Sequence, residues 1–91
     1  MILRTKKFKQ DYKRLSAGRH AGSLLERLGE VIALIAADRP IPESYRDHAL
    51  IGTWKDCRDC HLKPDLILVY RKPDPYTLEL VRLGSHSELG L

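Results

Sequence analysis

The sequence has no apolar stretch near the ~20 residues that a membrane span requires. Its 91 residues leave room for one small hydrophobic core. Only Met1–Leu3 precede the first arginine, which is too short for the apolar part of a secretory signal. We therefore expect a single domain over residues 1–91 that stays in the cytoplasm and does not bind a membrane.

Cysteine is scarce: the chain has two, Cys57 and Cys60, and a reducing compartment disfavours a disulfide between them. Together with His61 they match C-x-x-C-H, the haem-attachment pattern of c-type cytochromes. We reject haem because covalent attachment belongs to exported proteins and the only methionine is Met1. In the strand expected here, cysteines three residues apart would also point to opposite faces.

Zinc is the second metal hypothesis, because Cys57, Cys60 and His61 could be joined by His48 to make four ligands. Cysteine pairs that bind zinc usually lie in turns rather than strands, and the sequence has no second C-x-x-C motif. We prefer to treat both cysteines as small packing residues. The sequence therefore predicts no metal and no cofactor.

Acidic residues are scarce near the N-terminus, where Met1–His20 has seven Lys or Arg residues against Asp11 alone. The difference, seven minus one, is a local charge of +6 that suits a polyanion, although a solvated helix face would look the same. The candidates for contact with RNA or the ribosome are Arg4, Lys6, Lys7, Lys9, Lys13, Arg14, Lys55 and Lys63.

Hydrophobic spacing predicts an α+β fold in the order strand, helix, helix and three strands, followed by a short helical turn. Residues 1–5 suit the first strand, and Phe8, Tyr12 and Leu15 recur on one face of the first helix. Ser23 is the expected N-cap of the second helix, with Glu26 completing a capping box; this helix should end near residue 38, before prolines. The remaining elements are expected as a loop over 40–52, strands over 53–62, 66–70 and 77–83, a hairpin connection over 72–76 and a last turn over 85–89.

Short links between the last three strands predict an antiparallel meander. Both helices should pack on one face of this small antiparallel sheet and leave the other face open. On the last strand, Leu78 and Leu80 share a face with Arg82. A bulge near the strand end is therefore expected if Arg82 is to reach the open face.

Three histidines stand beside expected strand ends or loops and have aspartates nearby in sequence: His48, His61 and His86, with Asp47, Asp59 and Asp65. Cleavage of RNA by transesterification needs a base for the ribose 2′-hydroxyl, a cation for the phosphoryl oxygens and an acid for the departing 5′-oxygen. Histidine suits both proton transfers because its ordinary pKa is near 6.5, and arginine suits the phosphate. Such a route needs no metal.

The segments DHALIGTWKDCRDCHLKPDLILVY and VRLGSHSEL resemble the YafQ branch of the RelE-type bacterial toxins. The pattern D-H-x-L-x-G-x-W-K, then H-x-x-P-D, then R-x-G-x-H carries the resemblance, while the N-terminal half agrees mainly in layout. The resemblance implies a RelE-like fold and a ribosome-dependent endoribonuclease that cuts mRNA in the A site of the 70S ribosome. It also implies a cognate antitoxin of the DinJ/RelB kind, with the toxin as a monomer inside a hetero-oligomeric complex.

The positions that match the family's site are His48, His61, Asp65, Arg82 and His86. The resemblance implies that His86 is the general acid and Arg82 the phosphate clamp. It leaves the base and substrate-positioning duties shared among the other three residues. Two positions differ from the family pattern: Leu66 and Gly90 stand where relatives often carry aromatic residues, which can stack on RNA bases.

Two other functions fit parts of the sequence. A ParE-like toxin of the same fold inhibits DNA gyrase without cutting RNA, and a plain RNA-binding module would need only the basic residues. Neither function requires three histidines and Asp65, and this set therefore favours the nuclease.

Overall fold

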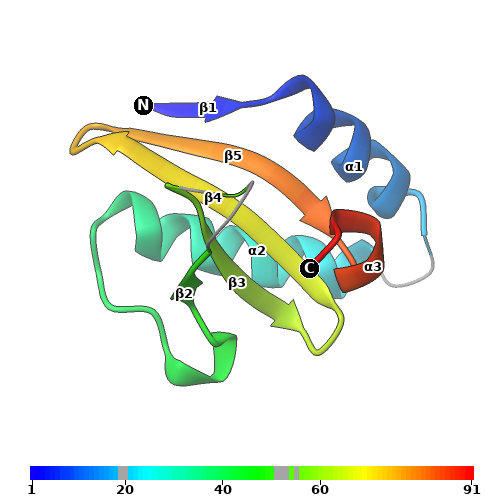
Figure 1. Cartoon of the computed structure of the whole chain (residues 1–91). Helices are drawn as coiled ribbons and strands as arrows, with labels where there is room; N and C mark the ends of the chain where they lie inside the picture. The colour runs from blue at the N-terminus through cyan, green and yellow to red at the C-terminus, as the bar shows by residue number, and fades with distance from the viewer. Residues whose placement is uncertain (19–20, 51–53, 55) are drawn as a thin grey trace.

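A computed structural model gives the fold and describes residues 1–18, 21–50, 54 and 56–91. The elements are β1 (Ile2–Arg4), α1 (Lys6–Ser16), α2 (Ala21–Ala36), the 3-10 helix η1 (Glu43–Tyr45), β2 (His48–Ala49), β3 (Arg58–Lys63), β4 (Leu66–Asp74), β5 (Thr77–Gly84) and α3 (His86–Leu89) (Figure 1). None of these helices is long and apolar enough to cross a membrane. The expected α+β class is confirmed, and the short strand β2 lies within the stretch expected as a loop.

The five strands form one sheet in the order β1-β5-β4-β3-β2. β3, β4 and β5 make the predicted antiparallel meander, and β2 pairs antiparallel with β3. β1 runs parallel to β5, so the prediction of a purely antiparallel sheet is wrong and the sheet is mixed. Nearly the whole chain separates these two strands, and only a long connection of this kind permits parallel pairing.

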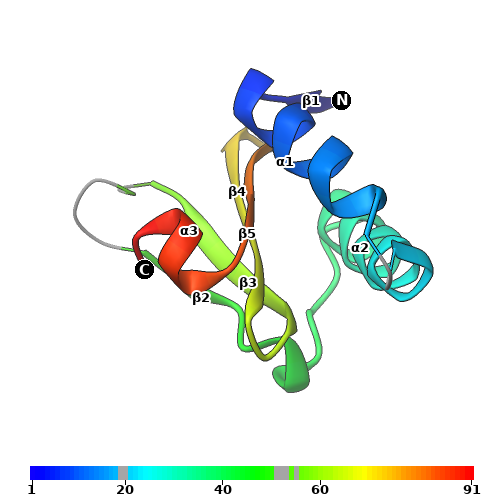
Figure 2. The ribbon, with the colours of Figure 1, turned by 90° about the vertical axis from the view of Figure 1, so that its right-hand side faces the viewer.

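Helices α1 and α2 lie on one side of the sheet, as predicted, while α3 lies on the other (Figure 2). The main core is between the sheet and the two long helices, where Leu28 and Val31 of α2 join Cys60, Leu62 and Leu68 of the sheet. Full burial of one such aliphatic side chain contributes about 1.5–3 kcal/mol. Most of the hydrophobic stabilisation of the fold therefore comes from the helix-covered face.

The opposite face, which we call the open face, carries a smaller apolar cluster under α3. Its buried members are Cys57, Ile67, Val69 and Leu89. The two cysteines are buried on opposite faces of the sheet, as expected of packing residues. Burial raises the pKa of the Cys60 thiol to about 12, which keeps this side chain protonated and unreactive at neutral pH.

The two long helices differ in how well the sequence predicted their starts. Thr5 caps α1, because its hydroxyl accepts a hydrogen bond from the backbone N–H of Phe8. The predicted capping box at Ser23 is wrong, because α2 already begins at Ala21.

The end of β5 contains the bulge that was expected from the positions of Leu78, Leu80 and Arg82. Tyr70 of β4 pairs with Leu80, and Val69 pairs with Arg82, so Val81 is skipped in the register. Val81 therefore packs on the open-face cluster, while Leu83 returns to the main core. The extra residue sets Arg82 opposite Val69 in the register.

Two strand boundaries differ from the prediction. β4 continues through Pro73 to Asp74, although residues 72–76 were expected to connect the hairpin. The register shifts between Arg71 and Asp74, and at such an irregularity proline needs no N–H for the ladder. β3 begins at Arg58, later than expected; of the earlier part of the expected strand, residues 53 and 55 lie outside the described residues.

Candidate active site

The histidines of the site come from the short strand β2, the strand β3 and the helix α3. Residue pairing sets His48 opposite Asp59, and His61 two residues further along β3 opposite Ile67. Since residues two apart on a strand share a face, Asp59 and His61 both lie on the open face. The rings of His48 and His61 stack with their centroids 6.0 Å apart.

His86 completes the group from the first turn of α3. Its Nε2 lies 3.4 Å from Nε2 of His61, and the two ring centroids are 5.3 Å apart. Ser85 fixes the start of α3 through a capping box with Glu88, which confirms the expected last helical turn. Only one of the two facing nitrogens can carry a proton in this contact, so one ring donates the hydrogen bond and the other accepts it.

Asp65, in the turn between β3 and β4, contacts His86 on the side of the ring opposite Nε2. Its Oδ1 accepts a hydrogen bond from the His86 backbone N–H at 3.0 Å and lies 2.7 Å from His86 Nδ1. The backbone hydrogen bond, then the ring contact, lower the pKa of the Asp65 carboxyl. A carboxylate at Nδ1 fixes the proton on that nitrogen and leaves Nε2 of His86 to face the site.

His48 has its Nδ1 between two oxygen acceptors. The carbonyl oxygen of Arg46 lies 2.8 Å away, and Oδ1 of Asp59 lies 2.9 Å away. A carbonyl can only accept, so Nδ1 carries the proton and neutral His48 has its lone pair on Nε2. His48 is therefore set up to take a proton from a substrate.

Asp59 is the site residue that the sequence analysis did not select. It is 3% exposed, and burial raises the pKa of its carboxyl even though charges on His48 and His61 would lower it. Its Oδ1 and the Nδ1 of His61 are buried without a hydrogen-bond partner among the described residues. The 2.9 Å contact of Asp59 Oδ1 with His48 is an ion-pair distance and not a hydrogen bond. Its spacing of two from His61 on a strand was the signal that could have identified it.

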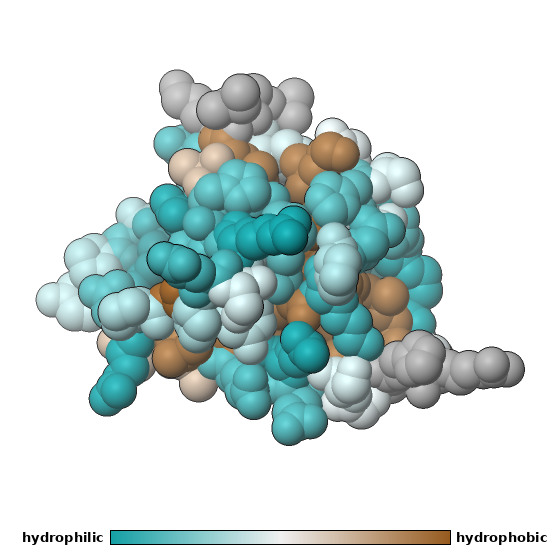
Figure 3. Space-filling model, turned by 90° about the horizontal axis from the view of Figure 1, so that it is seen from below, coloured by the Kyte–Doolittle hydropathy of each residue, from teal (hydrophilic) through white to brown (hydrophobic). Residues whose placement is uncertain are grey.

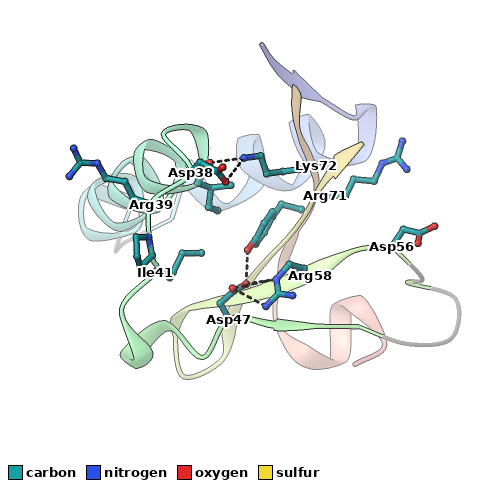
Figure 4. Close-up of a pocket in the computed structure, with 11 residues that line it drawn as sticks. Asp38, Arg39, Ile41, Asp47, Asp56, Arg58, Arg71 and Lys72 are labelled. Atoms are coloured by element: carbon teal, nitrogen blue, oxygen red, sulfur yellow. Dashed lines mark hydrogen bonds and ion pairs between the residues drawn. The ribbon is translucent and has the colours of Figure 1, made fainter. Parts of the chain in front are cut away.

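Asp47 lies next to His48 in the chain but belongs to the other face of the sheet. Its carboxylate accepts hydrogen bonds from Arg58 at 3.1 Å and from the hydroxyl of Tyr70 at 2.5 Å (Figure 4). Tyr70 is part of the main core, and burial raises the pKa of its hydroxyl. Asp47 therefore anchors β2 to the helix-covered face and takes no part in the histidine group.

Arg82 is bound by an aspartate from α1 rather than standing free beside the histidines. Its Nε donates to Asp11 Oδ2 at 2.7 Å and its Nη2 donates to Asp11 Oδ1 at 3.2 Å. Asp11 also accepts from the backbone N–H of Leu83 at 3.0 Å and is itself 4% exposed. Burial acts to raise the pKa of Asp11, but these hydrogen bonds and the arginine charge outweigh it and lower the pKa.

Four of the five predicted site residues thus meet, namely His48, His61, Asp65 and His86, and Asp59 joins them. The side chain of the fifth, Arg82, is hydrogen-bonded to Asp11 rather than to the histidines or Asp65. A profile of the family described as "Bacterial toxin of type II toxin-antitoxin system, YafQ" matches residues 1–90. The chain belongs to the YafQ toxin family. The resemblance found in the sequence is confirmed.

Similar proteins and solved structures support membership of this family. An Escherichia coli K12 protein named "mRNA interferase toxin YafQ" is 45% identical over 56 residues, or 62% of this chain and 60% of that protein. A crystal structure of a metal-bound toxin from Helicobacter pylori is 48% identical, with a TM-score of 0.87 over 98% of this chain and 97% of that one. The toxin in an E. coli DinJ-YafQ toxin-antitoxin complex is 34% identical, with a TM-score of 0.82 over 98% and 94%. The stretches aligned with the curated relatives from E. coli and Haemophilus influenzae span 60% and 54% of those proteins.

The site of this YafQ-family chain also contains a possible metal-ligand set. His48, Asp59 and His61 each offer a ligand atom, and the three atoms lie within 4.8 Å of one another. Two imidazoles and a carboxylate are a donor set that zinc and other transition metals accept. Cys57 and Cys60, which the sequence offered as zinc ligands, are buried on opposite faces and cannot share one ion.

The basic arm of the YafQ-family chain lies on β1 and α1, elements that carry none of the site histidines. Its side chains are exposed at Arg4, Lys6, Lys7, Lys9, Lys13 and Arg14. Arg14 pairs with Glu88 of α3 at 2.9 Å and so links this arm to the element that carries His86. Lys63 is half-buried at the end of β3, and Lys55 lies outside the described residues.

Proposed function

We propose that the chain is an endoribonuclease that cuts mRNA on the ribosome by transesterification. The observation that carries this proposal is the meeting of His48, His61 and His86 from three elements, with a carboxylate behind each outer ring. The E. coli relative named as an mRNA interferase toxin supports it.

We assign the general base to His48. Its Nδ1 faces acceptors on both sides, so Nε2 is the nitrogen that removes the proton from the ribose 2′-hydroxyl. The resulting oxygen attacks the adjacent phosphorus and expels the 5′-oxygen, which leaves a 2′,3′-cyclic phosphate. Asp59 stabilises the imidazolium that forms on His48.

We assign the general acid to His86, whose protonated ring is stabilised by Asp65 at 2.7 Å. Its Nε2 delivers the proton to the departing 5′-oxygen. His61 lies between the two outer histidines and exchanges a proton with His86 across 3.4 Å. Positioned acid and base groups of this type each contribute about 10²- to 10⁴-fold to a rate.

Arg82 remains our candidate for the charge that develops on the phosphate. Asp11 occupies Nε and one hydrogen of Nη2, so the Nη1 edge of the guanidinium stays available. In this arrangement Asp11 orients the arginine without using all of its donors. The Arg82 side chain is 20% exposed, so part of it is open to solvent.

We propose that the partners of the chain are the ribosome and a DinJ-type antitoxin, and that it acts in the cytoplasm. The exposed basic arm would bind ribosomal RNA through its phosphates, an interaction that weakens steeply with salt. The E. coli relative solved as a DinJ-YafQ complex supports the choice of antitoxin.

The test uses purified protein, translating ribosomes and a chelator. We expect cleavage of ribosome-bound mRNA and little cleavage of naked RNA, with 2′,3′-cyclic phosphate ends. His86→Ala should lose at least about 100-fold in rate, with Arg82→Ala also losing most of the activity, while both variants keep the parent's circular dichroism spectrum. Unchanged cleavage by both variants would overturn the assignment. Activity that returns only with added zinc would instead favour a metal held by His48, Asp59 and His61.

A further inference from the structure

A small polar cavity opens beside His61, where the 3-10 helix η1, the β3–β4 turn and α2 meet. Its volume is about 130 Å³, and we call it the Arg46 cavity, defined by Arg27, Tyr45, Arg46, His61 and Lys63. The face seen from below is largely hydrophilic (Figure 3). Since His61 belongs to both the histidine site and this cavity, the two are adjacent.

The charge of the Arg46 cavity is entirely positive. Arg27, Arg46 and Lys63 line it, and no acidic side chain does. Within the described part of the chain, none of the three cations lies within 4.0 Å of a carboxylate oxygen, whereas Arg58, Arg71 and Arg82 each have such a partner. Cations gathered without counter-charges attract an anion.

The two arginines of the cavity are positioned in different ways. Arg27 donates from Nη1 to the carbonyl oxygen of Leu62 at 3.1 Å, which leaves its other N–H groups available. Arg46 has a left-handed backbone with a φ of 49°, a conformation that costs a non-glycine residue on the order of 1 kcal/mol. This turn lets the Arg46 carbonyl orient His48 while its side chain lines the cavity.

We propose that the Arg46 cavity binds the RNA phosphate next to the one that is cut. The proposal rests on the proposed nuclease function and adds a substrate subsite to it. The cavity is smaller than the about 300–1,000 Å³ of sites that enclose whole small molecules, which favours a phosphate over a complete nucleotide. Its arginines can bind phosphate oxygens in pairs. Lys63, expected from the sequence to contact RNA, would act here.

The test measures binding without cleavage, using a short single-stranded RNA with 2′-O-methyl groups, which cannot undergo transesterification. Affinity is measured for the full-length chain at several salt concentrations. Each phosphate contact on a single strand contributes about 0.7 to the slope of log affinity against log salt. We expect Arg46→Gln and Lys63→Gln each to bind more weakly and to lower the slope by about 0.7.

Arg39→Gln is the matched control. Arg39 is exposed just beyond the C-terminal end of α2 and is not among the residues that line the Arg46 cavity. It lines the separate pocket that contains Asp47 and Arg58 (Figure 4). This variant should bind as the parent does. Equal slopes for the parent, Arg46→Gln and Lys63→Gln would overturn the subsite, as would the absence of binding to the parent. If the slopes change but the parent cuts no mRNA on ribosomes, the cavity is an RNA-phosphate site, and the nuclease function is wrong together with the placement of this phosphate beside a cut one.

Discussion

Asp11 and Asp59 are buried almost equally, at 4% and 3% exposure, yet the pKa of the first is lowered and that of the second is raised. Asp11 accepts three hydrogen bonds, two from Arg82 and one from the Leu83 backbone. Asp59 has an oxygen without a hydrogen-bond partner among the described residues, and its nearest cation sources are histidines. Equal burial therefore has opposite consequences, depending on whether the carboxylate is paired.

The difference separates a structural carboxylate from a functional one. A fully paired buried carboxylate fastens two segments together, as Asp11 fastens α1 to the end of β5. A buried carboxylate with few hydrogen bonds destabilises the folded state, because its charge has lost water without gaining partners. Such residues are concentrated at functional sites, where a group must change its charge. Asp59 lies between His48 and His61, where the proposed reaction moves protons.

The largest expected effect follows from removing the charge of Asp59 with Asp59→Asn. The amide keeps the shape of the carboxylate but cannot stabilise a charged His48, so the rate of mRNA cleavage should fall on the order of 100-fold. The measurement is single-turnover cleavage on translating ribosomes across a range of pH. Asp38→Asn is the control, because the Asp38 side chain is 90% exposed and contacts Lys72 rather than any histidine. Equal losses in both variants would contradict a special role for Asp59.

Removing Asp11 should mainly lower the stability of the fold. Asp11→Ala leaves Arg82 and the Leu83 N–H without their partner, which should lower the free energy of unfolding by about 2–3 kcal/mol. Asp11→Asn should lose less, because its amide oxygen can still accept from Leu83. Urea unfolding followed by circular dichroism gives both values. If Asp11→Ala is as stable as the parent, the ion pair does not fasten α1 to β5.

The stability of the two variants should depend on pH with opposite signs. The lowered pKa of Asp11 makes its carboxylate stabilising above its ordinary value of 3.8, and this contribution disappears as pH falls through the folded-state pKa. Near neutral pH the parent should therefore have a higher melting temperature than Asp11→Asn. The difference between the two melting temperatures should disappear as the pH is lowered. The raised pKa of Asp59 makes its charged form a cost that grows as pH rises above 3.8.

Asp59→Asn should accordingly be more stable than the parent near neutral pH, while being less active. Below about pH 3.8 the two melting temperatures should converge. Thermal unfolding between pH 3 and pH 7 tests both variants in one series. A melting temperature of Asp59→Asn below that of the parent at neutral pH would reverse our interpretation of this carboxylate.

The same two aspartates mark what the sequence could and could not predict. His48, His61, Asp65 and His86 were predicted through a motif, and strand alternation from His61 was enough to suggest Asp59. Asp11 was beyond prediction, because its partner Arg82 is 71 residues away in the chain. The parallel pairing of β1 with β5 was not predicted for the same reason, because the sequence of a three-residue strand does not indicate which distant strand it pairs with. Local patterns predicted the elements, and long-range pairing set their final partners.

The smallest expected effect concerns Arg14, whose guanidinium lies 3.8 Å from Asp11 and 2.9 Å from Glu88. The Arg14 and Glu88 side chains are 50% and 41% exposed, and exposed pairs contribute only about 0–1 kcal/mol. Arg14→Gln should therefore lower the free energy of unfolding by less than about 1 kcal/mol, and less still in high salt. A loss as large as that of Asp11→Ala would mean that Asp11 depends on Arg14 as much as on Arg82. The buried pair and the exposed pair would then act as one unit rather than as an anchor with a weak surface contact.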